Sequence, residues 1–243
     1  YTKQQVMQIV KDSAQTHGIP PDDFLRFAAI ETGFKFDENA HNHGSGAKGL
    51  FQFVPATAKA YGIAGREFDP TVNAAAAAQL YQDNKKSLEH SHEKTLHPYL
   101  SGATQPNGLD LYLAHQQGAA GYASIQSAIA TGHFSRDSTR GNLIGNVGND
   151  MEKTTGISKT EFSKLSDQEM ALTYTQYWQN KYARISIPEM GITPENAPAA
   201  HQHAASSNQV TEAFSSAYDM SLKYDHLKYG FGNKSLKGNS IDC

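Results

Sequence analysis

The sequence contains almost no cysteine: Cys243, at the last of its 243 positions, is the one thiol. One thiol cannot close a disulfide within the chain, and no Cys-x-x-Cys or Cys/His pattern typical of a zinc site is present. Long apolar runs are missing as well, since no stretch approaches the roughly 18 residues that a membrane-spanning helix needs. The sequence therefore predicts neither a disulfide scaffold, nor a cysteine metal centre, nor a membrane span.

An excess of positive charge is also missing. The chain carries 21 Lys and Arg against 24 Asp and Glu, a formal net charge of −3. Proteins that bind nucleic acid through bulk charge usually carry a basic excess, so we expect no nucleic-acid partner. Histidine is plentiful, at 11 residues, but no HExxH pattern is present. His41 and His43 are therefore interpreted as exposed loop residues, and we expect no metal and no cofactor.

Helix signals dominate the sequence, and strand signals are scarce. Asp22 or Asp23 is the predicted N-cap of one helix, and Gly118 and Gly132 break and end two others. Residues 34–50 are irregular and could hold a short β-hairpin at most. The sequence predicts an all-α fold with at most this small hairpin, and apolar spacing predicts helices at residues 2–17, 22–33, 55–62, 69–90, 107–117 and 119–131.

The chain after residue 132 carries weaker signals. Residues 133–150 are rich in Gly, Asn and Ser, which indicates a long surface loop. Two capping-box patterns follow, Ser158 with Glu161 and Ser166 with Glu169. The second pattern opens a helix with a tyrosine-rich stripe, which we interpret as helix packing.

The C-terminal end predicts an extended connection over residues 186–208, a last helix at about 209–229, and a polar, mobile tail. We divide the chain into a core over residues 1–132 and a helical extension over residues 133–243. The extension is expected to pack on the core without being independent of it, with residues 133–157 as the candidate hinge.

Glu31 occupies an unusual position for a carboxylate. On a helix from residue 22 to 33 it shares the apolar face with Phe24, Phe27 and Ala28, at positions i, i+3, i+4 and i+7. Burial without a charge partner raises the pKa of a carboxyl group, and a protonated carboxyl can donate to a leaving oxygen. The alternative is a frayed helix end that turns Glu31 into water.

Four blocks of the sequence occur in the order and rough spacing of one known family. Its patterns E-S-x-F, G-A-x-G-L-x-Q-x-x-P-x-T-A-x-x-Y-G and D-P-x-x-N are matched by ETGF at residues 31–34, by residues 46–62 and by DPTVN at residues 69–73. LYLAHQQGAAGY follows at residues 111–122. Over residues 20–130 the chain resembles the soluble lytic transglycosylase domain, a lysozyme-like family that cleaves peptidoglycan.

The resemblance implies a lysozyme-like fold with additional C-terminal helices, and it implies a catalytic role for Glu31. In the family this carboxyl protonates the β-1,4 glycosidic oxygen between N-acetylmuramic acid and N-acetylglucosamine, then acts as base. Attack by the muramic C6 hydroxyl gives a 1,6-anhydro product. A muramidase would instead use water and a second carboxylate, for which Asp37 and Glu38 are the candidates. The motif leaves both outcomes open.

The resemblance also suggests residues that bind substrate, and it has departures. Gln52 lies where the family has a glutamine that lines the cleft. Ser45 is near the family's loop serine, but the loop before residue 49 is a few residues longer here. The family's A-Y-N-A-G motif reads AHQQG at residues 114–118, so His115 and Gln116 replace tyrosine and asparagine. Both can still hydrogen-bond a sugar.

A non-catalytic reading stays open beside the enzyme: a peptidoglycan-binding module, or a structural module of a virion or secretion apparatus. The N-terminal segment resembles an amphipathic helix rather than a signal peptide, and the chain begins at Tyr1. These features favour a domain of a longer phage or secreted protein that acts in the bacterial periplasm or cell wall. Its expected partners are peptidoglycan glycan strands, with an inhibitor or immunity protein or a delivery apparatus as further candidates.

Overall fold

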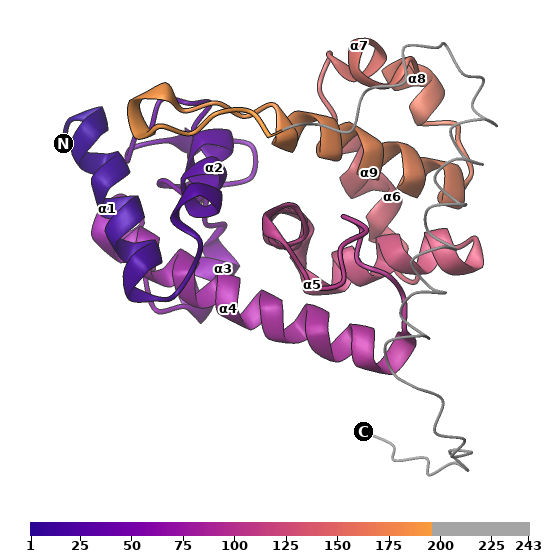
Figure 1. The fold of residues 1–243 in the computed structure, drawn as a ribbon, viewed down its shortest axis with the longest axis horizontal. Coiled ribbons are helices and arrows are strands. Elements are labelled where there is room, and N and C mark those ends of the chain that lie inside the picture. Colours follow the sequence, from indigo (N-terminus) through magenta and orange to yellow (C-terminus); the bar gives the residue numbers. More distant parts are fainter. Residues whose placement is uncertain (196–243) are drawn as a thin grey trace.

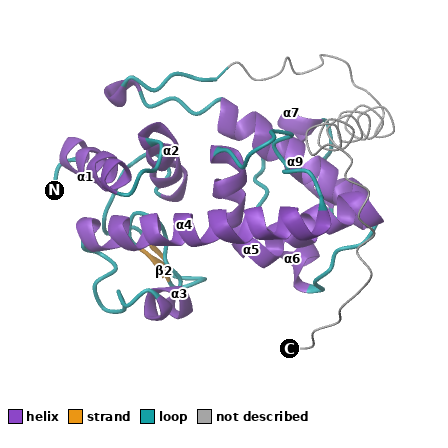
Figure 2. Ribbon diagram, turned by 60° about the horizontal axis from the view of Figure 1, so that its bottom comes forward, coloured by secondary structure: helices purple, strands orange, loops and turns teal. Residues whose placement is uncertain are grey.

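The computed structural model describes residues 1–195, and this part of the chain is mainly helical (Figure 1). The predicted all-α class with one small hairpin is confirmed. The hairpin pairs β1 (His41–Asn42) with β2 (Ala47–Lys48) in antiparallel register (Figure 2). The helices are α1 (Lys3–Thr16), α2 (Pro21–Glu31), α3 (Pro55–Ala60), α4 (Pro70–Thr95), α5 (Gly108–Thr131), α6 (Ser138–Gly145), α7 (Met151–Thr155), α8 (Lys159–Phe162) and α9 (Asp167–Ala183).

Helix α4 is the long helix against which the N-terminal helices assemble. It packs against α1 and α5, and α1 packs in turn against α2 (Figure 1). Its alanine-rich stretch buries Ala74, Ala77 and Ala78, whose small side chains let neighbouring helices approach closely. The carboxylate of Asp69 caps the helix by accepting from the backbone N–H of Thr71 (2.9 Å). The helix ends at residue 95, beyond the predicted end at residue 90.

Helix α5 is interrupted where the sequence predicts a break. Gly118 has φ 73° and ψ 158°, a backbone conformation that a residue with a Cβ rarely adopts. The helix ends at Gly132, which has φ 89°. The two predicted helices at 107–117 and 119–131 are therefore the two halves of α5, which packs against α4 on one side and α9 on another.

The prediction that Asp22 or Asp23 caps α2 was wrong. Pro20 occupies the N-cap position and Pro21 begins the helix, and no side chain accepts a hydrogen bond from the first turn. Proline suits the first helical position because its fixed φ is already helical and its missing N–H would have had no partner there. The two aspartates lie inside the first turn, where negative charge is favourable at the positive end of the helix dipole.

The prediction of a surface loop over residues 133–150 was also wrong. This segment contains α6, and its Thr139, Leu143 and Val147 are buried. Thr139 donates to the hydroxyl of Ser124 in α5 at 2.8 Å. Two turns of helix with one buried face are too short to produce a clear apolar period in a sequence rich in Gly and Asn.

The two predicted capping boxes are confirmed at the starts of α8 and α9. Helix α9 packs along α5, and the tyrosines of its stripe, Tyr174, Tyr177 and Tyr182, are buried, as expected for packing residues. The predicted last helix at 209–229 and the polar tail lie outside the described residues, as does most of the connection at 186–208. The division at residue 132 stays a prediction.

After α9 the chain turns back toward the N-terminal helices (Figure 1). A short 3-10 helix, Pro188–Met190, lies near α1, where Lys3 contacts Glu189 at 2.6 Å. Further along, Glu195 contacts Arg26 of α2 at 3.4 Å. This return segment links the end of α9 to the helices that carry the N-terminal motifs.

Candidate active site

Glu31 is the last residue of α2, and its carboxyl does not turn out into water. Phe24, Phe27 and Ala28 on the same helix face are buried, as the spacing predicted. The side chain of Glu31 is 17% exposed, and it opens into a hollow on the surface. The helix is not frayed at this end, so the interpretation of Glu31 as a solvated terminal residue was wrong.

The chain reversal after Glu31 is fixed by Thr32. Its hydroxyl donates to the carbonyl of Ala28 at 2.7 Å and accepts from the backbone N–H of Phe36 at 2.9 Å. Gly33 and Phe34 both have positive φ, at 58° and 64°. This turn ends the helix directly after Glu31 and leads the chain into a loop that lines the hollow.

Burial raises the pKa of Glu31 from 4.5 to about 7. The hydroxyl of Tyr112, in α5, donates to Oε1 of Glu31 at 3.2 Å, and this hydrogen bond opposes the rise. The Glu31 carboxyl therefore holds its proton up to about neutral pH. Once the proton is lost, the hydrogen bond from Tyr112 stabilises the carboxylate. Sequence reasoning missed Tyr112, although it lies three residues before His115 and hence on the same helix face.

His115 lies beside this pair without carrying charge. Its Nε2 is 3.1 Å from the carbonyl oxygen of Phe51 and 3.8 Å from Oε1 of Glu31. A carbonyl can only accept, so Nε2 carries the hydrogen. Burial lowers the pKa of His115 to about 4, which leaves the ring neutral at ordinary pH. The contact with Glu31 is therefore one between a neutral ring and a carboxyl group.

The hollow beside Glu31 has a volume of about 510 Å³. It is polar, and its walls come from the end of α2, the following loop, the hairpin and the turn after β2. The lining residues are Glu31, Thr32, Lys35, Asp37, Ala40, His41, Asn42, His43 and Gln52. Of the residues predicted from the sequence, Glu31, Asp37 and Gln52 are brought together here.

Gln52 has an unusual backbone conformation, with φ 49°. Its side-chain Nε2 donates to the carbonyl of Gly49 at 2.8 Å and to that of Ala40 at 3.1 Å. These bonds use both hydrogens of the amide, and they leave Oε1 as an acceptor at the hollow. An acceptor of this kind suits the N–H of an N-acetyl group.

A buried asparagine holds the turn that carries Gln52. Asn73, fully buried in α4, accepts from the backbone N–H of Phe51 at 3.0 Å and donates to the carbonyl of Glu67 at 2.8 Å. Gly49 has φ 79°, and a Cβ there would clash with Glu67 and Asn73. Gly49 of the GLFQF block leaves the space in which Asn73 of DPTVN binds the turn. This shared contact explains why the two motifs occur together.

Besides His115, three predicted residues do not line the hollow. Glu38 accepts from the amino group of Tyr1 at 3.2 Å. Ser45 lies in the hairpin turn, where its hydroxyl accepts from Ala47 at 3.3 Å. Gln116 points to α9, where it accepts from the hydroxyl of Tyr174. Their part in catalysis or substrate binding stays a prediction.

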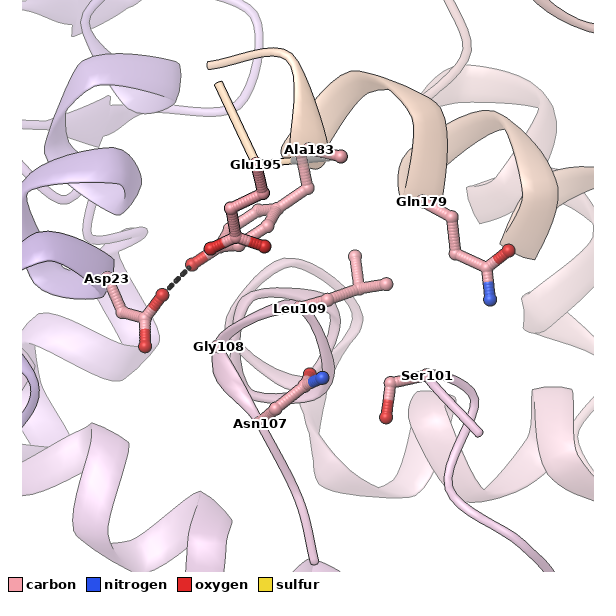
Figure 3. Close-up of a pocket in the computed structure, with 9 residues that line it drawn as sticks. Asp23, Ser101, Asn107, Gly108, Leu109, Gln179, Ala183 and Glu195 are labelled. Carbon is pink, nitrogen blue, oxygen red and sulfur yellow. Dashed lines mark hydrogen bonds between the residues drawn. The ribbon is translucent and has the colours of Figure 1, made fainter. Parts of the chain in front are cut away.

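A second hollow, of about 250 Å³, lies at the other end of α2 (Figure 3). Asp23 is on its wall, eight residues before Glu31, which is roughly 12 Å along a helix axis. Its carboxylate accepts from the hydroxyl of Tyr182 at 2.7 Å, and Ser101 on the opposite wall donates to Asp110 at 2.6 Å. Because these groups are already paired, this hollow is a weaker candidate for chemistry.

Within residues 1–195, no group of three or more His, Cys, Asp or Glu side chains is arranged to hold a metal ion. The helices of this part of the chain include none that is long and apolar enough to cross a membrane.

Residues 8–108 match the sequence model of one family, the transglycosylase SLT domain. The match contains Glu31, the hollow and the whole of α4, and it ends where α5 begins. Neither a curated protein nor a solved structure shows significant similarity to the chain. The resemblance to the lysozyme-like lytic transglycosylases is confirmed over this segment, which matches the SLT domain, and the helical fold agrees with that of the family.

Proposed function

We propose that this chain, which carries an SLT domain over residues 8–108, is a lytic transglycosylase with Glu31 as its acid and base. The bond cleaved is the β-1,4 bond between N-acetylmuramic acid and N-acetylglucosamine in bacterial peptidoglycan. The observation that carries the proposal is a carboxyl with a pKa of about 7 at the wall of a 510 Å³ polar hollow. The family match supports peptidoglycan as the substrate and the bacterial cell wall as the site of action.

The reaction needs two proton transfers at Glu31, one from the carboxyl and one back to the carboxylate. Protonated Glu31 donates to the glycosidic oxygen as the bond to the muramic C1 breaks, which leaves a carboxylate and an oxocarbenium-like sugar. The carboxylate then takes the proton of the C6 hydroxyl, whose oxygen closes onto C1. The products are a 1,6-anhydromuramic end and a free N-acetylglucosamine end, and Glu31 is protonated again without consumption of water.

Tyr112 and Gln52 support this cycle. The Tyr112 hydroxyl donates to Glu31 and stabilises the carboxylate that exists between the two proton transfers. Neutral His115 limits the space beside the carboxyl, since its Nε2–H is held by Phe51. Gln52 presents a free acceptor to an N-acetyl group on the substrate, because both of its amide hydrogens are bonded to the turn.

One observation favours hydrolysis as a second candidate. Asp37 lines the same hollow as Glu31, so it could support attack by water as the second carboxylate of a muramidase. One of its oxygens accepts from the backbone N–H of Asn39 at 2.9 Å, which leaves the other oxygen for a water molecule. Glu38 does not line the hollow.

The test is digestion of purified sacculi by the wild type and by Glu31→Gln, followed by mass spectrometry of the released muropeptides. We expect 1,6-anhydro ends from the wild type and no release from the variant. The matched control is Glu152→Gln on the surface of α7, which should release as much as the wild type. Reducing ends would favour hydrolysis with Asp37. Equal release by Glu31→Gln would contradict the catalytic role, and tight binding without release by the wild type would favour a binding module.

A further inference from the structure

The hollow beside Glu31 has a second set of side chains that the proposed chemistry does not use. His41 and His43 are two residues apart in the hairpin and project on the same side, with ring centroids 4.1 Å apart. Lys35, from the loop after α2, lines the same hollow. All three are exposed. We refer to Lys35, His41 and His43 as the basic rim.

The hairpin holds the basic rim in a defined position. Asn42, between the two histidines, accepts at its side-chain oxygen from the backbone N–H of Gly44 (3.0 Å) and of Ser45 (3.2 Å). On the other side, the carbonyl of Ala40 accepts from Nε2 of Gln52 at 3.1 Å. The rim is therefore tied to the residue proposed to bind the N-acetyl group, and it lines the same hollow as Glu31.

The electrostatic surroundings of the rim favour an anion. Lys48 lies opposite His41 in the hairpin register, and its ammonium is 5.8 Å from the ring centre of exposed Phe68. Burial, His43 and Lys48 all lower the pKa of His41. A negative charge placed beside His41 would act against this lowering.

Two carboxyl groups face the rim and must be weighed against it. Glu31 is neutral while it holds its proton, so below pH about 7 it adds little negative charge. Asp37 offsets the charge of Lys35, and one of its oxygens is already bonded to Asn39. The positive charge at the rim therefore comes from Lys35, with Lys48 behind it, and the imidazoles supply N–H groups that can donate to a carboxylate.

We propose that the basic rim binds the free carboxylates of the peptide stem on muramic acid, so that the enzyme prefers strands that carry charged stems. This inference rests on the proposed function, since it takes peptidoglycan as the substrate. The stem is attached through the lactyl group at C3 of the same ring whose C1 bond is cleaved. If that bond lies at Glu31, the stem starts from the same sugar ring, and we place it in the hollow that the rim lines.

The test compares two forms of one polymer. Soluble glycan strands with intact stems are prepared, and one half is amidated with carbodiimide and ammonia, which turns each carboxylate into a carboxamide of nearly the same shape. For the wild type we expect kcat/KM to be roughly three- to fivefold higher on the charged strands, as expected for a few exposed ion pairs. In the double variant His41→Gln/His43→Gln, we expect this ratio to fall close to one.

Two further variants sharpen the comparison. Lys35→Gln should lower in part the ratio of kcat/KM on charged strands to kcat/KM on amidated strands. His90 is an exposed histidine on α4, and His90→Gln should keep the wild-type ratio. Circular dichroism verifies that each variant is folded, and the single variant His43→Gln replaces the double one if the latter is not. A wild-type ratio of one, or a double variant that keeps the wild-type ratio, would overturn the proposal.

A binding measurement separates this inference from the proposed function. In the Glu31→Gln background, affinity for charged and amidated strands is measured with and without the two histidine substitutions. If the wild type cleaves neither polymer, the catalytic proposal is contradicted, and the ratio of the two affinities alone decides for or against the rim. The rim proposal is supported if the protein binds charged strands more tightly and the histidine substitutions abolish this preference. Equal affinities for charged and amidated strands overturn it.

Discussion

Two regions of this molecule bury a carboxyl group, and they do so in different ways. Asp110, in the first turn of α5, is fully buried and accepts hydrogen bonds from Ser101 N–H and Oγ, from Asn107 N–H and from the hydroxyl of Tyr122, at 2.6–3.0 Å. Within residues 1–195, Glu31 accepts one hydrogen bond, from Tyr112. Burial raises the pKa of both carboxyl groups, but several donors oppose the rise at Asp110 and only Tyr112 opposes it at Glu31.

The two regions also differ in what surrounds the carboxyl. The donors around Asp110 tie the loop before α5 to two positions of that helix, and the group has no access to solvent. Glu31 opens into a hollow large enough for sugar rings. Burial alone therefore does not identify a catalytic acid. Glu31 combines burial with few donors and with access for a substrate, and this combination is why we propose it as the catalytic acid.

The largest expected effect comes from removing the proton at Glu31. Glu31→Gln should lower kcat on glycan strands by about 1,000-fold, in line with the usual contribution of a positioned general acid. Initial rates of strand cleavage, followed by separation of the products, give the measurement. Asp110→Asn, if folded at the assay temperature, should retain kcat within about threefold, because the wild-type carboxyl takes no part in proton transfer. A comparable loss of kcat in both variants would contradict the proposed difference between the two carboxyl groups.

For stability, we expect the larger loss in the Asp110 variant and not in the Glu31 variant. Asp110→Asn should reduce the free energy of unfolding by about 2–4 kcal/mol, because the amide nitrogen would face N–H and O–H donors inside the protein. Urea denaturation followed by circular dichroism measures the change. Asp137→Asn, at an exposed position before α6, is the matched control and should change stability by less than about 0.5 kcal/mol. If Asp110→Asn lost as little stability as the control, the hydrogen bonds of Asp110 would contribute little to the free energy of unfolding.

Glu31 should make the protein less stable as pH rises. The unfolded chain loses this proton near pH 4.5 and the folded protein near pH 7, so between these values only the folded state still binds it. Stability therefore falls over this range. Above pH about 7.5, Glu31→Gln should be more stable than the wild type by about 2–3 kcal/mol, and below pH about 4.5 the difference should vanish. Thermal unfolding of both proteins at pH 4 and pH 8 tests this expectation, which a pH-independent difference would contradict.

The smallest expected effect concerns the one donor to Glu31. Tyr112→Phe removes a hydrogen bond that lowers the pKa of Glu31, so the pKa should rise and the alkaline decline of kcat/KM should move to higher pH. At pH 6 the activity should fall only about fivefold, the value of one hydrogen bond to the carboxylate. Tyr174→Phe, in α9, is a control that removes a buried hydroxyl without touching Glu31. An alkaline limb that moves to lower pH would contradict the assigned role of Tyr112.

The sequence was sufficient to predict the buried helix face that carries Glu31 and the small hairpin, because local patterns carry both, while the roles of Glu31 and Gln52 stay predictions. The helix spacing placed Glu31 on a buried face, and the glycine-rich segment limited any strand to residues 34–50. These features depend on contacts within a few tens of residues, where periodicity and turn chemistry are informative.

The partners of the two carboxyls could not be predicted in this way. Tyr112 is 81 residues from Glu31, and the contact depends on how α5 packs against α2. The donors to Asp110 come partly from an irregular loop with no periodic signal. Helix α6 was missed for a related reason, since its burial depends on α5 and α9 rather than on its own pattern. Tertiary packing determined each of these features.

The most direct test of the account is the pKa of the Glu31 carboxyl itself. Carbon-detected NMR of protein labelled at the glutamate side chains, titrated from pH 3 to pH 9, follows each carboxyl. The resonance absent from Glu31→Gln identifies the group. The account predicts a midpoint near pH 7 for this resonance and a higher one in Tyr112→Phe. A midpoint near 4.5, the value of a solvated glutamate, would contradict it.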